Sequence, residues 1–269
     1  SLYFLNKYTA FDKIPNELID MNIASDYSKV GKMLELCQGE QRQDIIEKTV
    51  SGERIISEIT EKFNPAIEFK EKDLISMLYY LGYLTITGEE FGTPQLQIPN
   101  KVMKEIYADY FIQMISKETD FEIEQSEYNQ ITREIATEGK IDTIIEMTEK
   151  YLQNLSNRDY IKFDEKYVKL IFYCIAMNLK IFRIKSEMEI QRKYPDLLII
   201  PRDTEKGYCS VMIEFKYLKK GEENQLEIKQ KEAKAQIEEY ANFEDIKDIE
   251  KLNKYIVIAI NDKIYIEKI

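Results

Sequence analysis

Apolar side chains recur at helical spacing through the first part of the chain. Helical faces are predicted over 18–34 and 43–48, and a further short helix over 55–59, because apolar residues three or four apart share one side of a helix. The Asn64-Pro65 pair is expected to end this last helix, since proline has no backbone N–H to donate.

The stretch that follows combines a helix with two short strands. Apolar residues at a spacing of three or four predict a helix over 72–81, with Gly82 as its C-cap. Alternating apolar and polar residues then predict strands over 83–87 and 95–99, separated by a turn. A helix, a glycine and a strand–turn–strand follow one another in a winged-helix unit, so a winged-helix-like region is predicted here.

Beyond this region the pattern changes from mainly helical to mixed. Helical patterns continue at 100–116 and 125–157, and a polar linker is expected over 156–159. The elements predicted after the linker are helix, three strands, helix and two strands: 164–178, 180–190, 197–200, 208–217, 221–240, 255–260 and 263–266. This α-β-β-β-α-β-β order predicts an α/β domain of ordinary size.

The 269 residues include no histidine, which excludes several kinds of site. A Ser-His-Asp triad, a Cys-His pair and a His-ligated zinc all require it. Any metal must be held by carboxylate and carbonyl oxygens, which suit Mg²⁺, Mn²⁺ or Ca²⁺. Cys37, Cys174 and Cys209 form no CxxC motif and are typical of a reduced, cytoplasmic protein. No apolar run approaches the ~18 residues of a membrane span.

The formal charge of −11 is unevenly distributed. Residues 1–159 contain 17 Lys+Arg against 29 Asp+Glu, whereas residues 160–269 contain 21 against 20. Contact with phosphates needs local positive charge, so the acidic first part favours a protein-contact role for the winged-helix-like region. The second part is near neutral, so a local basic stripe that binds nucleic acid remains an open alternative there.

Three charged residues of the second part form a candidate catalytic site. Alternation along the strand 208–217 places Glu214 and Lys216 on one face. Asp196 begins the preceding strand, and a short turn lets the two strands pair as a hairpin, which would bring Asp196 within reach of Glu214. Two carboxylates can hold Mg²⁺ for phosphodiester hydrolysis. A neighbouring lysine can orient the attacking water and stabilise developing phosphate charge.

Each of these residues also has a structural interpretation. Pro195-Asp196 is a common strand start, and Glu214 with Lys216 can form a solvated face or a cross-strand ion pair. The catalytic interpretation depends on their conjunction: an acidic residue, a short apolar strand, a turn, and a second apolar strand ending in Glu-x-Lys.

Pro195-Asp196 followed by Glu214-Phe215-Lys216 resembles the signature of the PD-(D/E)xK nuclease superfamily. More narrowly, the chain is similar to the C-terminal part of bacterial AAA-ATPase-like proteins with a fused PD-(D/E)xK nuclease domain. The stretches that carry this resemblance are 81–86 with 98–100, 163–167, 195–199, 213–216 and 235–237. It implies a restriction-endonuclease-like mixed sheet for the second part of the chain.

The resemblance implies a role for each site residue. Asp196 and Glu214 would bind a divalent metal, Mg²⁺ or Mn²⁺, and Lys216 would be the catalytic lysine. Glu165 on the helix 164–178 would complete the metal site, and Gln236 on the later helix would face it as an additional site residue. Alternatively, Glu165 is a helix N-terminal charge favoured by the helix dipole, and Gln236 is an exposed helix residue.

The resemblance also implies a domain organisation and a function. The tail of an ATPase-like region is expected over 1–36, a helical and winged-helix-like region over 37–158, and the nuclease-like domain over 159–269. The chain contains no GxxxxGK[ST] motif and begins with Ser-Leu-Tyr, so a fragment of a longer protein is expected. The expected activity is Mg²⁺-dependent hydrolysis of nucleic acid, DNA before RNA, in the bacterial cytoplasm and without a membrane partner.

One departure from the family pattern supports an alternative function. Such proteins usually have an Arg directly before Pro-Asp and a Gly ahead of it, whereas this chain has Gln191-Arg192-Lys193-Tyr194. The alternative is a catalytically inactive nuclease-fold module that docks a protein partner. A further interpretation, in which the acidic region occupies the nuclease groove as a nucleic-acid mimic, also stays open.

Overall fold

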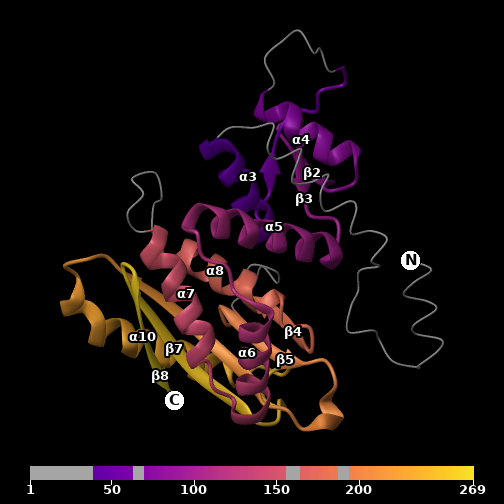
Figure 1. The fold of residues 1–269 in the computed structure, drawn as a ribbon. Coiled ribbons are helices and arrows are strands. Elements are labelled where there is room, and N and C mark those ends of the chain that lie inside the picture. Colours follow the sequence, from indigo (N-terminus) through magenta and orange to yellow (C-terminus); the bar gives the residue numbers. More distant parts are fainter. Residues whose placement is uncertain (1–38, 63–69, 156–163, 187–193) are drawn as a thin grey trace. The chain divides into compact units, whose positions relative to one another are not determined.

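A computed structural model describes residues 39–62, 70–155, 164–186 and 194–269 (Figure 1). The chain divides into two compact units, Ser1–Phe111 and Ile112–Ile269. The helical faces predicted over 18–34, the Asn64-Pro65 break and the 156–159 linker lie outside the described residues. None of the helices in the described ranges is long and apolar enough to cross a membrane.

The first unit contains a small antiparallel sheet and its flanking helices. Its described elements are α3 (Gly39–Ser51), β1 (Ile55–Ile56), α4 (Glu71–Tyr80), β2 (Thr85–Glu90) and β3 (Thr93–Gln97). The strand order is β1-β3-β2. The helix predicted over 55–59 is wrong, because Ile55 and Ile56 pair with Leu96 and Gln95 as a strand. Periodicity alone does not separate helix from strand in so short an apolar run.

Helix α4 confirms the predicted helix over 72–81. Its first turn is held by the Asp73 carboxylate, which accepts the Lys70 backbone N–H at 2.9 Å. Leu81 is the C-cap, and Gly82, predicted there, lies one residue later with a φ of 79°. Glycine adopts this left-handed conformation without the steric conflict that a Cβ brings.

Three helices precede the large sheet: α5 (Lys101–Thr119), which spans the division between the units, α6 (Gln125–Glu138) and α7 (Asp142–Leu155). The single helical pattern predicted over 125–157 is broken at Gly139, which ends α6 with a φ of 64°. Its N–H bonds to the Ile135 carbonyl at 3.0 Å, and its own carbonyl accepts the Tyr255 hydroxyl at 2.9 Å. The break therefore lets α7 run as a separate helix.

The remaining elements confirm the predicted α-β-β-β-α-β-β order. They are α8 (Glu165–Met177), β4 (Phe182–Ser186), β5 (Leu197–Pro201), β6 (Ser210–Leu218), α10 (Leu226–Tyr240), β7 (Leu252–Ile260) and β8 (Lys263–Lys268). Short 3-10 turns, η2 (Thr204–Lys206) and η3 (Glu223–Gln225), precede β6 and α10. The strands form one sheet in the order β4-β5-β6-β7-β8. Strands β6 and β7 are parallel and the other neighbours antiparallel, so the sheet is mixed.

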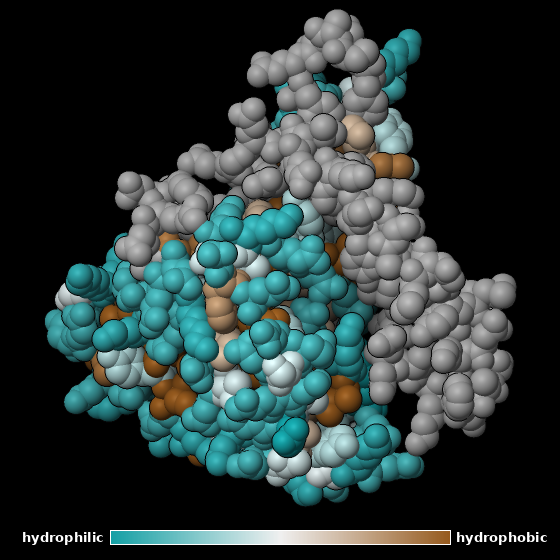
Figure 2. All heavy atoms as spheres, viewed as in Figure 1, coloured by the Kyte–Doolittle hydropathy of each residue, from teal (hydrophilic) through white to brown (hydrophobic). Residues whose placement is uncertain are grey.

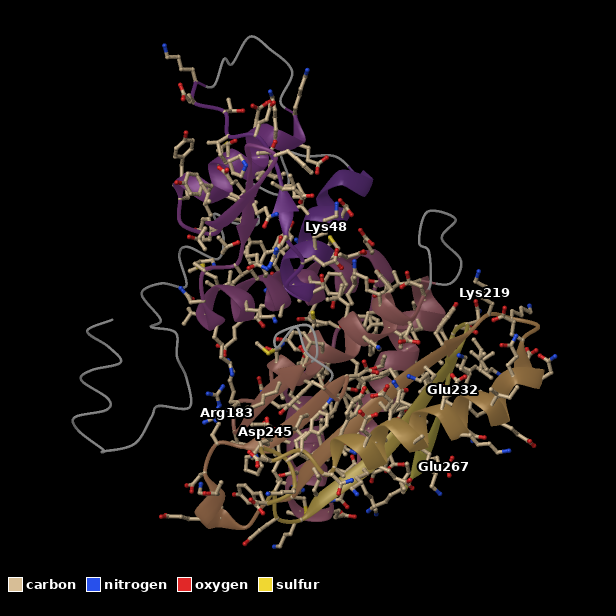
Figure 3. The ribbon with its side chains drawn as sticks, turned by 180° about the vertical axis from the view of Figure 1, so that it is seen from behind. Lys48, Arg183, Lys219, Glu232, Asp245 and Glu267 are labelled. Carbon is tan, nitrogen blue, oxygen red and sulfur yellow. The ribbon has the colours of Figure 1, made fainter. Side chains whose placement is uncertain are left out.

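Helices cover both faces of this sheet. Figure 1 shows α7 and α8 in front of it, and Figure 3, turned by 180°, shows α10 across the opposite face. Phe215 of β6 makes an edge-on contact with Phe172 of α8, with ring centroids 5.2 Å apart. Met212 of the same strand packs with Ala233 and Ile237 of α10. Odd and even positions of β6 therefore face different helices, as the alternation predicts.

The surface is mainly hydrophilic on the side of the molecule shown in Figure 2, where apolar patches are small and scattered. In the first unit several large apolar side chains are nevertheless exposed: Ile56, Tyr80, Leu81, Ile86 and Phe91. Phe91 lies in the turn between β2 and β3 and is completely exposed.

Candidate functional site

Asp196 lies directly before β5, next to the middle of β6. Leu197 pairs with Ile213 and Leu198 with Met212 in the antiparallel β5–β6 ladder, so the register continued by one residue places Asp196 opposite Glu214. The Asp196 side chain is only 4% exposed, and its Oδ2 accepts the backbone N–H of Phe215 at 2.7 Å. The predicted hairpin is therefore confirmed, and Asp196 is anchored to the strand that carries Glu214.

Glu214 and Lys216 project from the same face of β6. The Lys216 Nζ donates to the Glu214 Oε1 at 2.9 Å, and the side chains are 4% and 12% exposed for Glu214 and Lys216. The other Glu214 oxygen, Oε2, is buried without a hydrogen-bond partner. Buried polar atoms almost always have partners, so this oxygen calls for an explanation.

Lys169 connects the remaining predicted ligand to the site. Its Nζ lies 2.5 Å from Asp196 Oδ1 and 2.7 Å from Glu165 Oε1. Glu165 and Lys169 stand one turn apart on α8, which begins at the N-cap Asp164. We call Glu165, Lys169, Asp196, Glu214 and Lys216 the charged cluster. It contains all three predicted metal ligands and the predicted catalytic lysine, plus a second lysine.

The pKa values of two cluster residues are shifted. Burial, and then the charge of Asp196, raise the pKa of Glu214 from 4.5 to about 7, while Lys216 and Lys169 oppose this rise. For Lys169, burial lowers the pKa, but the negative charges of Asp196 and Glu165 outweigh burial and raise it above its usual range. Lys169 therefore stays positively charged, and Glu214 can gain or lose its charge near neutral pH.

Gln236 stands apart from these contacts. It lies half-buried on α10, next to Ile237, which packs into the core over β6. Glu232, one turn earlier and labelled in Figure 3, bonds to Lys229 at 2.8 Å. That bond is the main reason for its lowered pKa, to which Lys216 also contributes. Among the described residues no hydrogen bond links Gln236 to the charged cluster, so its predicted role stays a prediction.

Tyr194, directly before the Pro-Asp pair, is anchored by its side chain. This residue is buried, and its hydroxyl donates to Asp245 Oδ2 at 3.1 Å. Lys185 lies 4.0 Å from the same carboxylate oxygen. Tyr194 therefore anchors the backbone directly before Pro195-Asp196, at the position where the family resemblance leads us to expect Arg. Lys193 lies outside the described residues.

The oxygen donors of the cluster suit a hard divalent cation, but the cation already between them is an ammonium group. Within the described ranges no group of three or more His, Cys, Asp or Glu side chains is arranged to hold a metal ion. Asp196 and Glu214 offer carboxylate oxygens, which Mg²⁺ and Mn²⁺ prefer. The unpartnered Glu214 Oε2 is a buried acceptor that a cation would satisfy. The residues thus fit the ion chemically, with Lys169 bonded to two of the three ligands.

Comparison with known families concerns the part of the chain that contains this cluster. Residues 163–268 match the family model of the PD-(D/E)XK nuclease superfamily, so this part of the chain is similar to that superfamily. The match runs from α8 to β8 and includes the whole charged cluster. The mixed α/β sheet fits a restriction-endonuclease-like fold. No curated protein sequence matches the chain.

Lys169 is the cluster residue that the sequence analysis missed. Its spacing of four from Glu165 is a signal, because Glu and Lys at this spacing pair on a helix surface. That pattern is common on exposed helices, however, and nothing in the spacing points to Asp196, 27 residues later. Only the packing of α8 against the sheet joins them.

Proposed function

We propose that the second unit is a metal-dependent nuclease that hydrolyses phosphodiester bonds of nucleic acid. The observation that carries this proposal is the buried convergence of Asp196, Glu214 and Lys216, with one Glu214 oxygen unpartnered, inside a PD-(D/E)XK superfamily domain. Burying such charges costs free energy. A cluster of this kind therefore favours a chemical role over a structural one.

In this proposal Asp196, Glu214 and Glu165 hold Mg²⁺ or Mn²⁺. A bound divalent ion supplies Lewis-acid stabilisation of the phosphate oxygens and promotes ionisation of water. Lys216 positions the attacking water and stabilises negative charge that develops on the phosphate. Its 2.9 Å bond to Glu214 keeps the ammonium group at the carboxylate until substrate arrives.

Exposed lysines beside the site suit a polyanionic substrate. Lys219 and Lys220 follow β6, and Lys231 and Lys234 lie on α10, all on the surface; Lys219 is labelled in Figure 3. Each of these lysines can contact a phosphate, although Glu222, Glu223, Glu227 and Glu232 lie among them and the whole chain carries −11. We infer a nucleic-acid substrate, DNA before RNA.

Cleavage assays test this proposal. Labelled single- and double-stranded DNA and RNA are incubated with the full chain and Mg²⁺ or Mn²⁺. Asp196→Asn and Glu214→Gln are expected to lower cleavage by at least about 100-fold, since each removes a ligand charge. Asp262→Asn, in the turn between β7 and β8, is the matched control and should keep full activity. Equal cleavage by the parent and both site variants would refute the proposed nuclease activity of this site.

A second candidate function is a catalytically inactive nuclease-fold module that docks a protein. Lys169 favours this second function, because it neutralises two of the carboxylates. The first unit also favours it, for a different reason. The order α4-β2-β3 and the antiparallel β1-β3-β2 sheet support a winged-helix-like unit, and the exposed Phe91 follows the acidic Glu89 and Glu90. An apolar tip beside acidic residues suits a protein surface better than phosphates. This candidate predicts neither cleavage nor Mn²⁺ binding by the parent.

The wider setting is also a proposal. From the family resemblance we infer a bacterial, cytoplasmic protein whose activity is linked to an ATPase-like region outside this chain. Co-purification of the chain with an ATPase from its source cells, dependent on the first unit, tests that link.

A further inference from the structure

Lys169 holds the position of a cation between two carboxylates. Its Nζ lies 2.7 Å from Glu165 Oε1 and 2.5 Å from Asp196 Oδ1, and its side chain is only 18% exposed. Its charge also acts on the buried Glu214. One ammonium group thus pairs with two of the three carboxylates that the proposed function assigns to the metal and acts at a distance on the third.

An ammonium group and a divalent ion are mutually exclusive at this position. Mg²⁺ binds carboxylate oxygens at about 2.1 Å, so an ion on Asp196 Oδ1 would lie within a few ångströms of the Lys169 Nζ. Two positive charges that close repel strongly in a poorly hydrated site. Asp196 Oδ2 is the less available oxygen, because it already accepts the Phe215 N–H at 2.7 Å.

The Lys169 side chain is able to leave the charged cluster. Lys169 reaches the cluster through a flexible four-carbon stem, and Glu165, its partner on the same helix, is 40% exposed. Because Glu165 lies near the surface, rotation of the stem would carry the ammonium group past it into water without any movement of the backbone. Lys216 does not compete in the same way, since its bond goes to the other oxygen of Glu214, Oε1, and leaves Oε2 open.

We propose that Lys169 is an internal counter-cation, which occupies the metal position in the metal-free protein and leaves it when a divalent ion binds. This inference rests on the metal site of the proposed function. It makes Lys169 a positioning residue that keeps Glu165 and Asp196 together in the metal-free state and weakens divalent-ion binding in exchange.

Lysine labelling in the unaltered chain tests the displacement. Reductive methylation, followed by peptide mass spectrometry, measures the reaction rate of each lysine with and without saturating Mn²⁺. Lys169 should react roughly tenfold faster with Mn²⁺, because a lysine released from a largely buried ion pair becomes accessible. Lys150, which forms an i,i+4 pair with Glu146 on α7, is the internal control and should not change. Mn²⁺ binding with an unchanged Lys169 rate would overturn the inference.

Mn²⁺ titration calorimetry of Lys169→Met tests the competition. The dissociation constant for Mn²⁺ should fall by about tenfold or more relative to the parent, because binding no longer displaces an ion pair. Lys150→Met should bind as the parent does. If the parent binds no Mn²⁺, Lys169→Met should acquire binding. Lys169→Gln removes the charge but keeps a donor for Asp196, and it replaces Lys169→Met if that variant does not fold.

Failure of this inference differs from failure of the proposed function. Equal or weaker Mn²⁺ binding by the folded Lys169 variants refutes the counter-cation even if the parent cleaves DNA. Tighter binding by these variants upholds it even if the parent cleaves nothing.

Discussion

The Lys169 Nζ and the Asp196 Oδ1 lie 2.5 Å apart, although 27 positions separate the two residues in sequence. The other oxygen of Asp196 accepts the Phe215 N–H, so one carboxylate connects α8, the start of β5 and the middle of β6. Asp196 is therefore a structural residue as well as a predicted metal ligand. Any effect of its replacement on activity has to be separated from an effect on stability.

Asp196→Ala is expected to lower the free energy of unfolding by about 3 kcal/mol, since it leaves a largely buried ammonium group and a buried N–H without their partner. Urea denaturation of the parent and the variant measures this difference. The control is Glu232→Ala, which breaks the exposed pair with Lys229 and should leave stability nearly unchanged. Equal losses in both variants would contradict the anchoring role of Asp196.

Glu214 makes stability depend on pH. Its raised pKa, about 7 instead of 4.5, means that the folded chain retains a proton that the unfolded chain releases. Its contribution to stability therefore falls as the pH rises from about 4.5 to 7 and is constant above and below this range. Glu214→Gln should gain up to about 3 kcal/mol relative to the parent between pH 4 and pH 8.

The measurement is urea denaturation of parent and Glu214→Gln at several pH values, with a chelator present to remove divalent ions. Taking the difference between the two proteins cancels the other titrating groups. A difference that stays constant with pH would show that Glu214 titrates normally in the folded chain.

Lys216→Met should separate catalysis from metal binding. Loss of its ammonium group is expected to lower cleavage by about 100-fold or more, because a group that assists proton transfer or stabilises phosphate charge is gone. Mn²⁺ affinity measured by calorimetry should be unchanged or higher, since a cation leaves the site. Asp196→Asn should lower both quantities, and a Lys216→Met variant that lost only Mn²⁺ binding would reverse the assigned roles.

Gly139→Ala should destabilise the chain far more than Gly82→Ala. Both glycines have positive φ, so each substitution costs about 1 kcal/mol in backbone strain. At Gly139 an added Cβ would also overlap the side-chain amide of Asn253, whereas at Gly82 nothing lies within 4 Å. The melting temperatures of the two variants test this, and similar losses would show that the Asn253 side chain moves aside freely.

Much of the second unit follows from local pattern. Asp164 accepts the Tyr167 N–H at 2.8 Å and starts α8 where the helical pattern begins. The alternation along β6 correctly separates Phe215 from Met212 and Glu214, because successive side chains of a strand face opposite ways. The short-range pattern at Ile55 and Ile56 predicted a helix, but these residues form a strand because they pair with β3.

The sequence by itself determined which chemistry is open to this chain. The absence of histidine excluded sites that need an imidazole, and Pro195-Asp196 with Glu214-Phe215-Lys216 predicted where carboxylates and a lysine would meet. These features are local, since composition and strand periodicity need no knowledge of distant contacts. The tertiary structure alone decided that Lys169 lies between Glu165 and Asp196 and that one oxygen of Glu214 is buried without a partner. The first depends on α8 packing against the sheet and the second on the burial of Glu214 within β6, and burial magnifies the interaction of charges that the chain brings together from separate elements.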